Sequence, residues 1–156
     1  MRLRTLLGFG ALTAGAALIG TLATKKSVNS VWYNLELRKP SWQPPREAFG
    51  PVWTTLYALM AGSAARVYQS PPSRERSRAL KLWGAQLALN AAWSVIFFGA
   101  RRPKLAVAEL GVLLATIAAY MHQARSVDRG ATAMMAPYLG WTAFAAALNG
   151  SIAKNN

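Results

Sequence analysis

The sequence predicts an all-α integral membrane protein, a single domain of 156 residues that folds as a five-transmembrane-helix bundle. Two observations support this prediction. Hydrophobic residues make up 53% of the chain, yet the net charge is +13, because the charges lie between long uncharged runs. About 20 apolar residues cross a hydrocarbon core of roughly 30 Å, and five such segments leave no room for a soluble domain. The predicted helices cover about residues 5–24, 50–68, 80–100, 104–123 and 131–152.

The alternative fold class is a soluble, alanine-rich helical bundle, because the mean hydropathy is only +0.18. A soluble bundle places polar residues every three or four positions along its outer face. The run Gly130–Ala153 contains almost none. The uncharged runs therefore favour the membrane protein.

The first predicted helix resembles a secretory signal, with a basic start, an apolar stretch and small residues near its end. Its uncharged run Thr5–Thr24 is nevertheless long enough to cross a bilayer, and Lys25 and Lys26 follow directly. We expect a retained first helix, with a cleaved signal as the alternative.

The long connection of residues 25–49 combines aromatic, basic and proline residues. Each proline lacks a backbone N–H and restricts the residue before it, so the second helix is expected to begin near Pro51. Aromatic side chains suit the headgroup level of a membrane, and they also suit a lid over a flat aromatic ligand. The aromatic residues of this segment are Trp32, Tyr33, Trp42 and Phe49.

The second and third helices carry polar and aromatic stripes. Trp53 and Tyr57 lie one turn apart in the second helix, and Gln86, Asn90, Trp93 and Phe97 fall on one face of the third. A carboxamide in hydrocarbon is costly unless it is hydrogen-bonded, so both carboxamides should face a cavity or a partner helix. Hydrogen bonds between helices without any ligand explain them equally well.

The opposite face of the third helix carries Gly84, Ala88 and Ala92. Small residues at this spacing allow close helix approach. They predict a contact within the bundle or a homodimer interface.

The fourth helix contains Glu109, the one carboxylate inside a predicted span. It follows three basic residues, Arg101, Arg102 and Lys104, so we expect an ion pair there, with a proton or ligand role as the alternative. The only histidine, His122, stands at the end of this helix and is interpreted as an interfacial residue.

The fifth helix repeats the aromatic pattern, and Pro137 is expected to kink its first turn. Three helices thus each offer an aromatic stripe with a polar group, and together they predict a concave, aromatic-walled pocket. Taken singly, each stripe is explained by core packing. The stripe of the fifth helix contains Tyr138, Trp141, Ala145, Leu148 and Asn149.

Charge and composition exclude several classes of function. The chain contains no cysteine, which excludes disulfides and thiolate metal sites. It also lacks the paired carboxylates that would support hydrolytic catalysis, and it lacks a glycine-rich phosphate loop. The basic residues lie at span ends, where they attract anionic lipid, so we expect a bilayer and no nucleic acid as partner. The connections place nine Lys and Arg residues on each side of the membrane, so the positive-inside rule does not orient the chain.

Several segments together are similar to the TspO/translocator protein family, also called tryptophan-rich sensory proteins or the peripheral-type benzodiazepine receptor family. The resemblance covers about residues 32–149. The segments that carry it are WYNLELRKPSWQPP (32–45), FGPVWTTLYALM (49–60), Arg66-Val67, QLALNAAWSVIFFG (86–99) and PYLGWTAFAAALN (137–149).

The resemblance implies a membrane bundle of five helices, often dimeric, with a pocket closed by the loop after the first helix. Family members bind porphyrins, haem and related tetrapyrroles, and some bind sterols and benzodiazepine-type drugs. Two departures stand out: Glu47 replaces an aromatic residue common after the paired prolines, and no tyrosine follows Leu148 as the sterol pattern requires. By motif, the resemblance places Trp53, Asn90, Trp93, Trp141 and Ala145 in the pocket, with Trp32 and Tyr33 in the lid.

The leading hypothesis is a membrane protein that binds porphyrin or haem, for transport, sensing or sequestration, and that requires no other cofactor and no metal. The alternatives are a light- and oxygen-dependent porphyrin-degrading enzyme, with Trp53 and Trp141 as catalytic residues, and a ligand-free scaffold. The host is a bacterial cell membrane or, in a eukaryote, the outer mitochondrial membrane. The predicted ligand-binding residues are Trp32, Tyr33, Trp42, Phe49, Trp53, Tyr57, Gln86, Asn90, Trp93, Phe97, Tyr138, Trp141 and Ala145.

Overall fold

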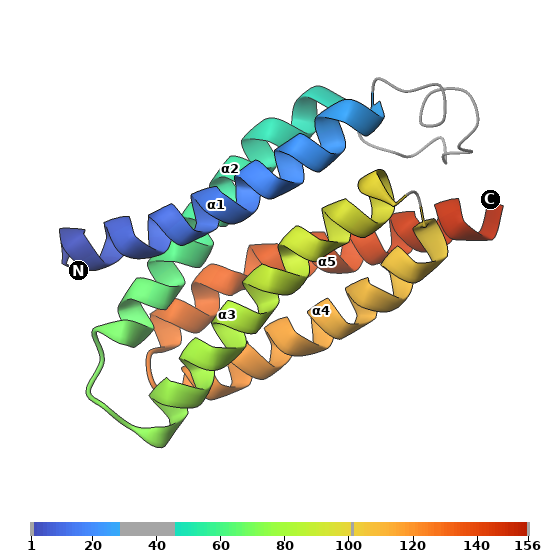
Figure 1. Ribbon diagram of the computed structural model, residues 1–156. Coiled ribbons are helices and arrows are strands. Elements are labelled where there is room, and N and C mark those ends of the chain that lie inside the picture. The colour runs from blue at the N-terminus through green and yellow to red at the C-terminus, as the bar shows by residue number, and fades with distance from the viewer. Residues whose placement is uncertain (1, 29–45, 101, 156) are drawn as a thin grey trace.

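The computed structural model describes residues 2–28, 46–100 and 102–155, and every regular element within them is a helix (Figure 1). The predicted all-α bundle of five helices is confirmed. Trp32, Tyr33 and Trp42 of the predicted lid lie outside the described residues, as does the side chain of Phe49. The elements are α1 (Leu3–Val28), α2 (Arg46–Tyr68), α3 (Arg74–Ser94), η2 (Val95–Gly99), α4 (Pro103–Arg125) and α5 (Arg129–Asn155).

The helices run along one another with α1 lying over α2 and α3 (Figure 1). Helix α3 packs against α4, α4 against α5, and α2 against α5, so the inner faces of α2 to α5 share one core. Tyr120 of α4 and Tyr138 of α5 are completely buried there. Both are amphipathic, so their hydroxyl groups require partners inside the bundle.

By length and composition, two helices in the described part of the chain are long and apolar enough to cross a membrane. They are α1, over Leu3–Leu22, and α4. Helix α1 also exposes large apolar side chains such as Leu7, Leu12 and Leu18. Lipid tails are as apolar as leucine, so this exposure is not penalised in a bilayer.

Helix α2 begins earlier than expected. It starts at Arg46, directly after Pro45, and continues through Pro51. The expectation that proline delays the helix to Pro51 was wrong: α2 accommodates Pro51 in its second turn, despite the lost intrahelical hydrogen bond and the steric demand of the ring on the preceding turn.

Helix α3 also begins earlier, at Arg74 rather than near residue 80. Ser73 caps it: its hydroxyl accepts a hydrogen bond from the backbone N–H of Arg76 at 3.0 Å. Glu75 in the first turn adds a favourable interaction with the helix dipole. A segment that composition assigned to a polar loop is therefore the first turn of a helix.

The end of the third predicted helix is not α-helical. After Ser94 the chain forms the π-helical turn η2, in which the N–H of Ala100 donates to the carbonyl of Val95 at 2.8 Å. Pro103 then opens α4, where its missing N–H is not needed for an intrahelical hydrogen bond. Helix α5 is continuous through Pro137, and a kink at this proline stays a prediction.

The two faces of α3 are separated as the periodicity predicted. Gln86 and Asn90 are buried, whereas Gly84 and Ala88 are exposed. Apart from its chain neighbours and the adjacent backbone of α3, no described heavy atom lies within 4 Å of the position that a Cβ would take at Gly84. This small-residue face is open, and a homodimer through Gly84, Ala88 and the half-buried Ala92 stays a prediction.

Candidate functional site

A chain of hydrogen bonds joins α2, α3 and α5 at the centre of the bundle. The Tyr57 hydroxyl donates to Oδ1 of Asn90 at 2.7 Å, and Nδ2 of Asn90 donates to the Tyr138 hydroxyl at 2.9 Å. Asn90 is only 5% exposed. The carboxamide of α3 therefore uses both its acceptor and its donor to connect two other helices.

Aromatic rings border this chain. Trp53 contacts Tyr57, Tyr138 and Trp141, at ring-centroid distances of 5.5, 6.3 and 6.3 Å. The planes of the Trp53 and Trp141 indoles meet at 89°, the edge-to-face geometry that ring quadrupoles favour. Trp141 in turn lies 5.5 Å from Phe144. The two tryptophans thus form one joined aromatic surface rather than two parallel plates.

Trp93 and Phe97 belong to a neighbouring group. Their rings stack at 5.5 Å, and Nε1 of Trp93 donates to Oδ1 of Asn149 at 3.3 Å. Nδ2 of Asn149 donates to the carbonyl of Ala145 at 2.8 Å. The predicted site residues therefore divide into a group around Asn90 and a group around Trp93.

Phe144 joins these two groups. Its ring contacts Trp141, and it also packs against a small cluster of buried residues that includes Phe97 and Leu148. Phe144 was not among the predicted site residues, because helical periodicity places it beside the predicted stripe rather than on it. The aromatic surface continues from α2 across α5 to the end of α3.

Two buried polar atoms beside the Asn90 group have no hydrogen-bond partner among the described residues. Gln86 is completely buried, and its Oε1 is unpaired. Thr142, which follows Trp141, is also buried, and its hydroxyl makes no hydrogen bond of regular geometry although Tyr138 is near. Sequence reasoning missed Thr142, although a threonine in an apolar run next to a tryptophan is a usable signal. Both oxygens are free to accept a hydrogen bond from an occupant of the site.

Glu109 makes no ion pair with two of its three expected partners, Arg102 and Lys104, among the described residues. Both its carboxylate oxygens are buried without a partner there. Arg101 lies outside them. The expectation of pairing with these two residues was wrong, because sequence proximity to basic residues does not bring their flexible side chains to a buried carboxylate.

A separate set of polar contacts holds the bundle where α4 turns into α5. Arg66 Nε donates to Oδ1 of Asp128 at 3.0 Å, and the same oxygen accepts from the N–H of Ala131 at 2.8 Å. Desolvation alone would raise the pKa of Asp128, but these hydrogen bonds and the positive charge of Arg66 lower it below the ordinary value of 3.8. Asp128 therefore stays ionised and holds α2 against the α4–α5 turn.

The sequence profile of the TspO/MBR family matches residues 9–154. The chain belongs to the TspO/MBR family. The tryptophan-rich sensory protein of Cereibacter sphaeroides is 41% identical to it over 118 residues, which cover 76% of this chain and 72% of that protein. The translocator protein of Ovis aries is 39% identical over 131 residues, covering 80% and 75%. The tryptophan-rich protein TspO of Chlorobaculum tepidum is 34% identical over 146 residues, covering 93% and 91%.

Membership of the TspO/MBR family confirms the resemblance found in the sequence. TspO/MBR proteins are membrane proteins, so the bundle of α1 to α5 is an integral membrane domain. The exposed leucines of α1 then face lipid.

Proposed function

We propose that this TspO/MBR protein binds a tetrapyrrole, porphyrin or haem, against the joined surface of Trp53 and Trp141. The observation that carries the proposal is this edge-to-face indole pair beside the buried Oε1 of Gln86, which lacks a partner among the described residues. A flat macrocycle offers a large apolar face to the rings, and each aromatic contact adds about 0.5–1.5 kcal/mol beyond burial. The perpendicular indoles favour a ligand that lies against one ring and the edge of the other.

The relatives named sensory protein and translocator protein suggest what such binding serves. A bound macrocycle that changes the packing of α2 against α5 would serve sensing, and one that is released to another partner would serve transport. Both uses, and sequestration, require the same first step of saturable binding at Trp53 and Trp141.

Titration of the full-length protein in detergent with protoporphyrin tests the proposal. We expect saturable quenching of tryptophan fluorescence and a shift of the porphyrin absorbance. Trp53→Leu and Trp141→Leu should each weaken binding by about two- to tenfold, the equivalent of one aromatic contact.

Trp83→Phe is the matched control. Trp83 packs edge-to-face against Phe9 at 5.1 Å and donates from Nε1 to the carbonyl of Met60 at 3.1 Å, so its indole is engaged elsewhere in the bundle. Its loss should leave the affinity unchanged. If Trp53→Leu and Trp141→Leu bind porphyrin as tightly as Trp83→Phe and the wild type, the Trp53–Trp141 surface is excluded as the site.

A second function, light-driven porphyrin degradation, is favoured by the direct contact between the two indoles, whose centroids lie 6.3 Å apart. Dioxygen is the oxidant in this reaction, and the excited porphyrin is the group oxidised. Illumination in air separates the two functions, because a protein that only binds leaves the porphyrin spectrum intact. Degradation by Trp53→Phe and Trp141→Phe at the wild-type rate would remove the tryptophans from that reaction.

A further inference from the structure

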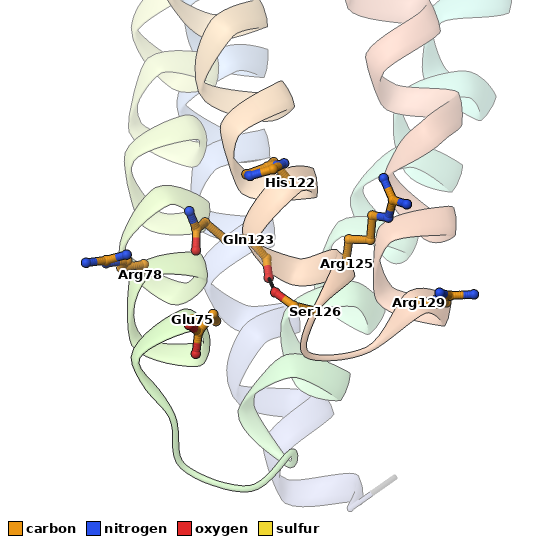
Figure 2. Close-up of a pocket in the computed structure, with 7 residues that line it drawn as sticks. All are labelled: Glu75, Arg78, His122, Gln123, Arg125, Ser126 and Arg129. Carbon is orange, nitrogen blue, oxygen red and sulfur yellow. Dashed lines mark hydrogen bonds between the residues drawn. The ribbon is translucent and has the colours of Figure 1, made fainter.

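A basic hollow lies where α3 begins, α4 ends and α5 begins (Figure 2). Its volume is about 530 Å³. We call its four basic residues, Arg78, His122, Arg125 and Arg129, the basic rim. Trp53 lies near the start of α2, and α2 begins at the other end of the bundle (Figure 1), so the hollow is distinct from the aromatic surface.

The three arginines of the basic rim have no counterion in the described part of the protein. None of them makes a hydrogen bond or an ion pair there. The carboxylate of Asp128 is engaged by Arg66. Glu75, the one carboxylate that lines the hollow, lies in the first turn of α3, where the helix dipole already stabilises it.

The position of one of these arginines is electrostatically unfavourable without an anion. Arg129 is the first residue of α5, and the positive end of the helix dipole disfavours a cation in the first turn of a helix. Only His122 and Arg125, in the last turn of α4, are favoured by their helix. An external anion would relieve this repulsion.

The shape of the hollow indicates which kind of anion it takes. Figure 2 shows the arginine side chains fanning outward from three helix ends rather than converging on one point. The hollow is open, and its arginines are exposed. A small inorganic ion would compete there with water on every side, whereas the acyl chains of an anionic lipid hold its headgroup at the membrane surface beside the basic side chains. Arginine binds phosphate oxygens in bidentate fashion.

The position of the hollow relative to the membrane also indicates a ligand at the membrane surface. The hollow lies beside the C-terminal end of α4, a helix long and apolar enough to cross the bilayer. Headgroups lie at the ends of such helices, and the anionic ones attract basic side chains there. We propose that the basic rim binds the headgroup of an anionic phospholipid, which joins the ends of α3, α4 and α5.

The test uses the full-length protein in a neutral detergent, titrated with short-chain phosphatidylglycerol. The measurements are the midpoint of thermal unfolding and the number of lipids retained in native mass spectrometry. We expect a saturable rise of the midpoint with phosphatidylglycerol and none with phosphatidylcholine. Each arginine lost from the basic rim should weaken the apparent affinity about fivefold, and Arg125→Gln/Arg129→Gln about 25-fold.

The control is Arg74→Gln/Arg102→Gln, which removes the same charge from exposed residues outside the basic rim. It should keep the wild-type affinity. If both double variants lose affinity equally, binding depends on net charge alone; if neither loses affinity, binding does not depend on the basic rim. Either outcome shows that the proposal is wrong. If inorganic phosphate produces the same saturable rise at the same concentrations, the lipid assignment is wrong and the hollow takes a soluble phosphate.

If Arg125→Gln/Arg129→Gln fails to fold, as judged by its helix content, two single variants of α3 test the proposal instead. Arg78→Gln and Arg74→Gln remove one charge each from exposed positions one turn apart on α3, and only Arg78 lines the hollow. Weaker phosphatidylglycerol binding in Arg78→Gln alone supports the proposal. Equal binding in the two variants overturns it.

Discussion

Gln86 and Asn90 are both buried carboxamides on the same face of α3, yet the structure predicts opposite effects when each is replaced by leucine. Asn90 makes two hydrogen bonds to tyrosines, at 2.7 and 2.9 Å. Gln86 has an unpaired Oε1, and its Nε2 reaches only the sulfur of Met60, at 4.0 Å. One side chain therefore stabilises the empty protein, and the other does not.

The magnitudes follow from the partners. Asn90→Leu removes two hydrogen bonds, each worth about 0.5–1.5 kcal/mol in water and about 0.6 kcal/mol on average in membrane bundles. It also leaves the hydroxyl of the fully buried Tyr138 without its donor. We expect a loss of about 1–3 kcal/mol and a fall in the unfolding midpoint of about 2–10 °C. Gln86→Leu removes an unpaired buried oxygen, so its effect should be neutral or stabilising.

The assay is thermal unfolding of the ligand-free variants in detergent, followed by porphyrin titration. Gln86→Leu should keep the unfolding midpoint of the wild type but bind porphyrin more weakly, since the Gln86 oxygen that it removes is free to accept a hydrogen bond from the ligand. If Gln86→Leu lowers the midpoint as much as Asn90→Leu, the reasoning about its unpaired oxygen is refuted. If both variants lose stability and porphyrin binding is unchanged, the carboxamides serve a ligand-free scaffold.

Three other predictions concern the contacts of α4 and of the turn between α4 and α5. Gly130→Ala should be about 1 kcal/mol less stable than the control Gly140→Ala in chemical denaturation, because a Cβ at Gly130 would meet the guanidinium of Arg66 at 2.6 Å and one at Gly140 meets nothing. Since folding lowers the pKa of Asp128, its stabilisation is complete above the unfolded-state pKa of about 3.9 and is lost as the pH falls through the folded value. The unfolding midpoint of Asp128→Asn should therefore change less with pH than that of the wild type, and an unchanged profile would contradict this. Tyr120→Phe should cost about 1 kcal/mol in the same denaturation, because it removes a buried 2.8 Å hydrogen bond to a serine hydroxyl of α2, and a neutral effect would show that this bond contributes nothing.

Periodicity predicted the faces of α3 well and its ends poorly. In hydrocarbon every backbone group must be paired within the segment, so a long uncharged run has little choice but to form a helix, and the spacing of Gln86 and Asn90 then sets the buried face. The ends depend on single contacts instead. The hydroxyl of Ser73 starts α3 six residues before the predicted position. The charged composition of that segment predicts a loop, because nothing in the sequence indicates which serine will form the N-cap of α3.

The candidate site was predictable as a set of residues but not as a set of contacts. The sequence placed Trp53, Asn90 and Trp141 on inner faces. It did not indicate that the two indoles meet at 89° or that Trp93 turns to Asn149 in a neighbouring group. It also misjudged Glu109, whose buried carboxylate has no described partner.

By itself, the sequence determined that this protein is a membrane bundle of five helices with carboxamides and tryptophans on their inner faces, because hydrophobic period and span length are local properties. Only the tertiary structure decided which polar groups are satisfied. The partners of Asn90 lie 33 residues before it and 48 residues after it, on different helices. Such pairing depends on how the helices are rotated and packed, and so does the gathering of Arg78, Arg125 and Arg129 around one hollow.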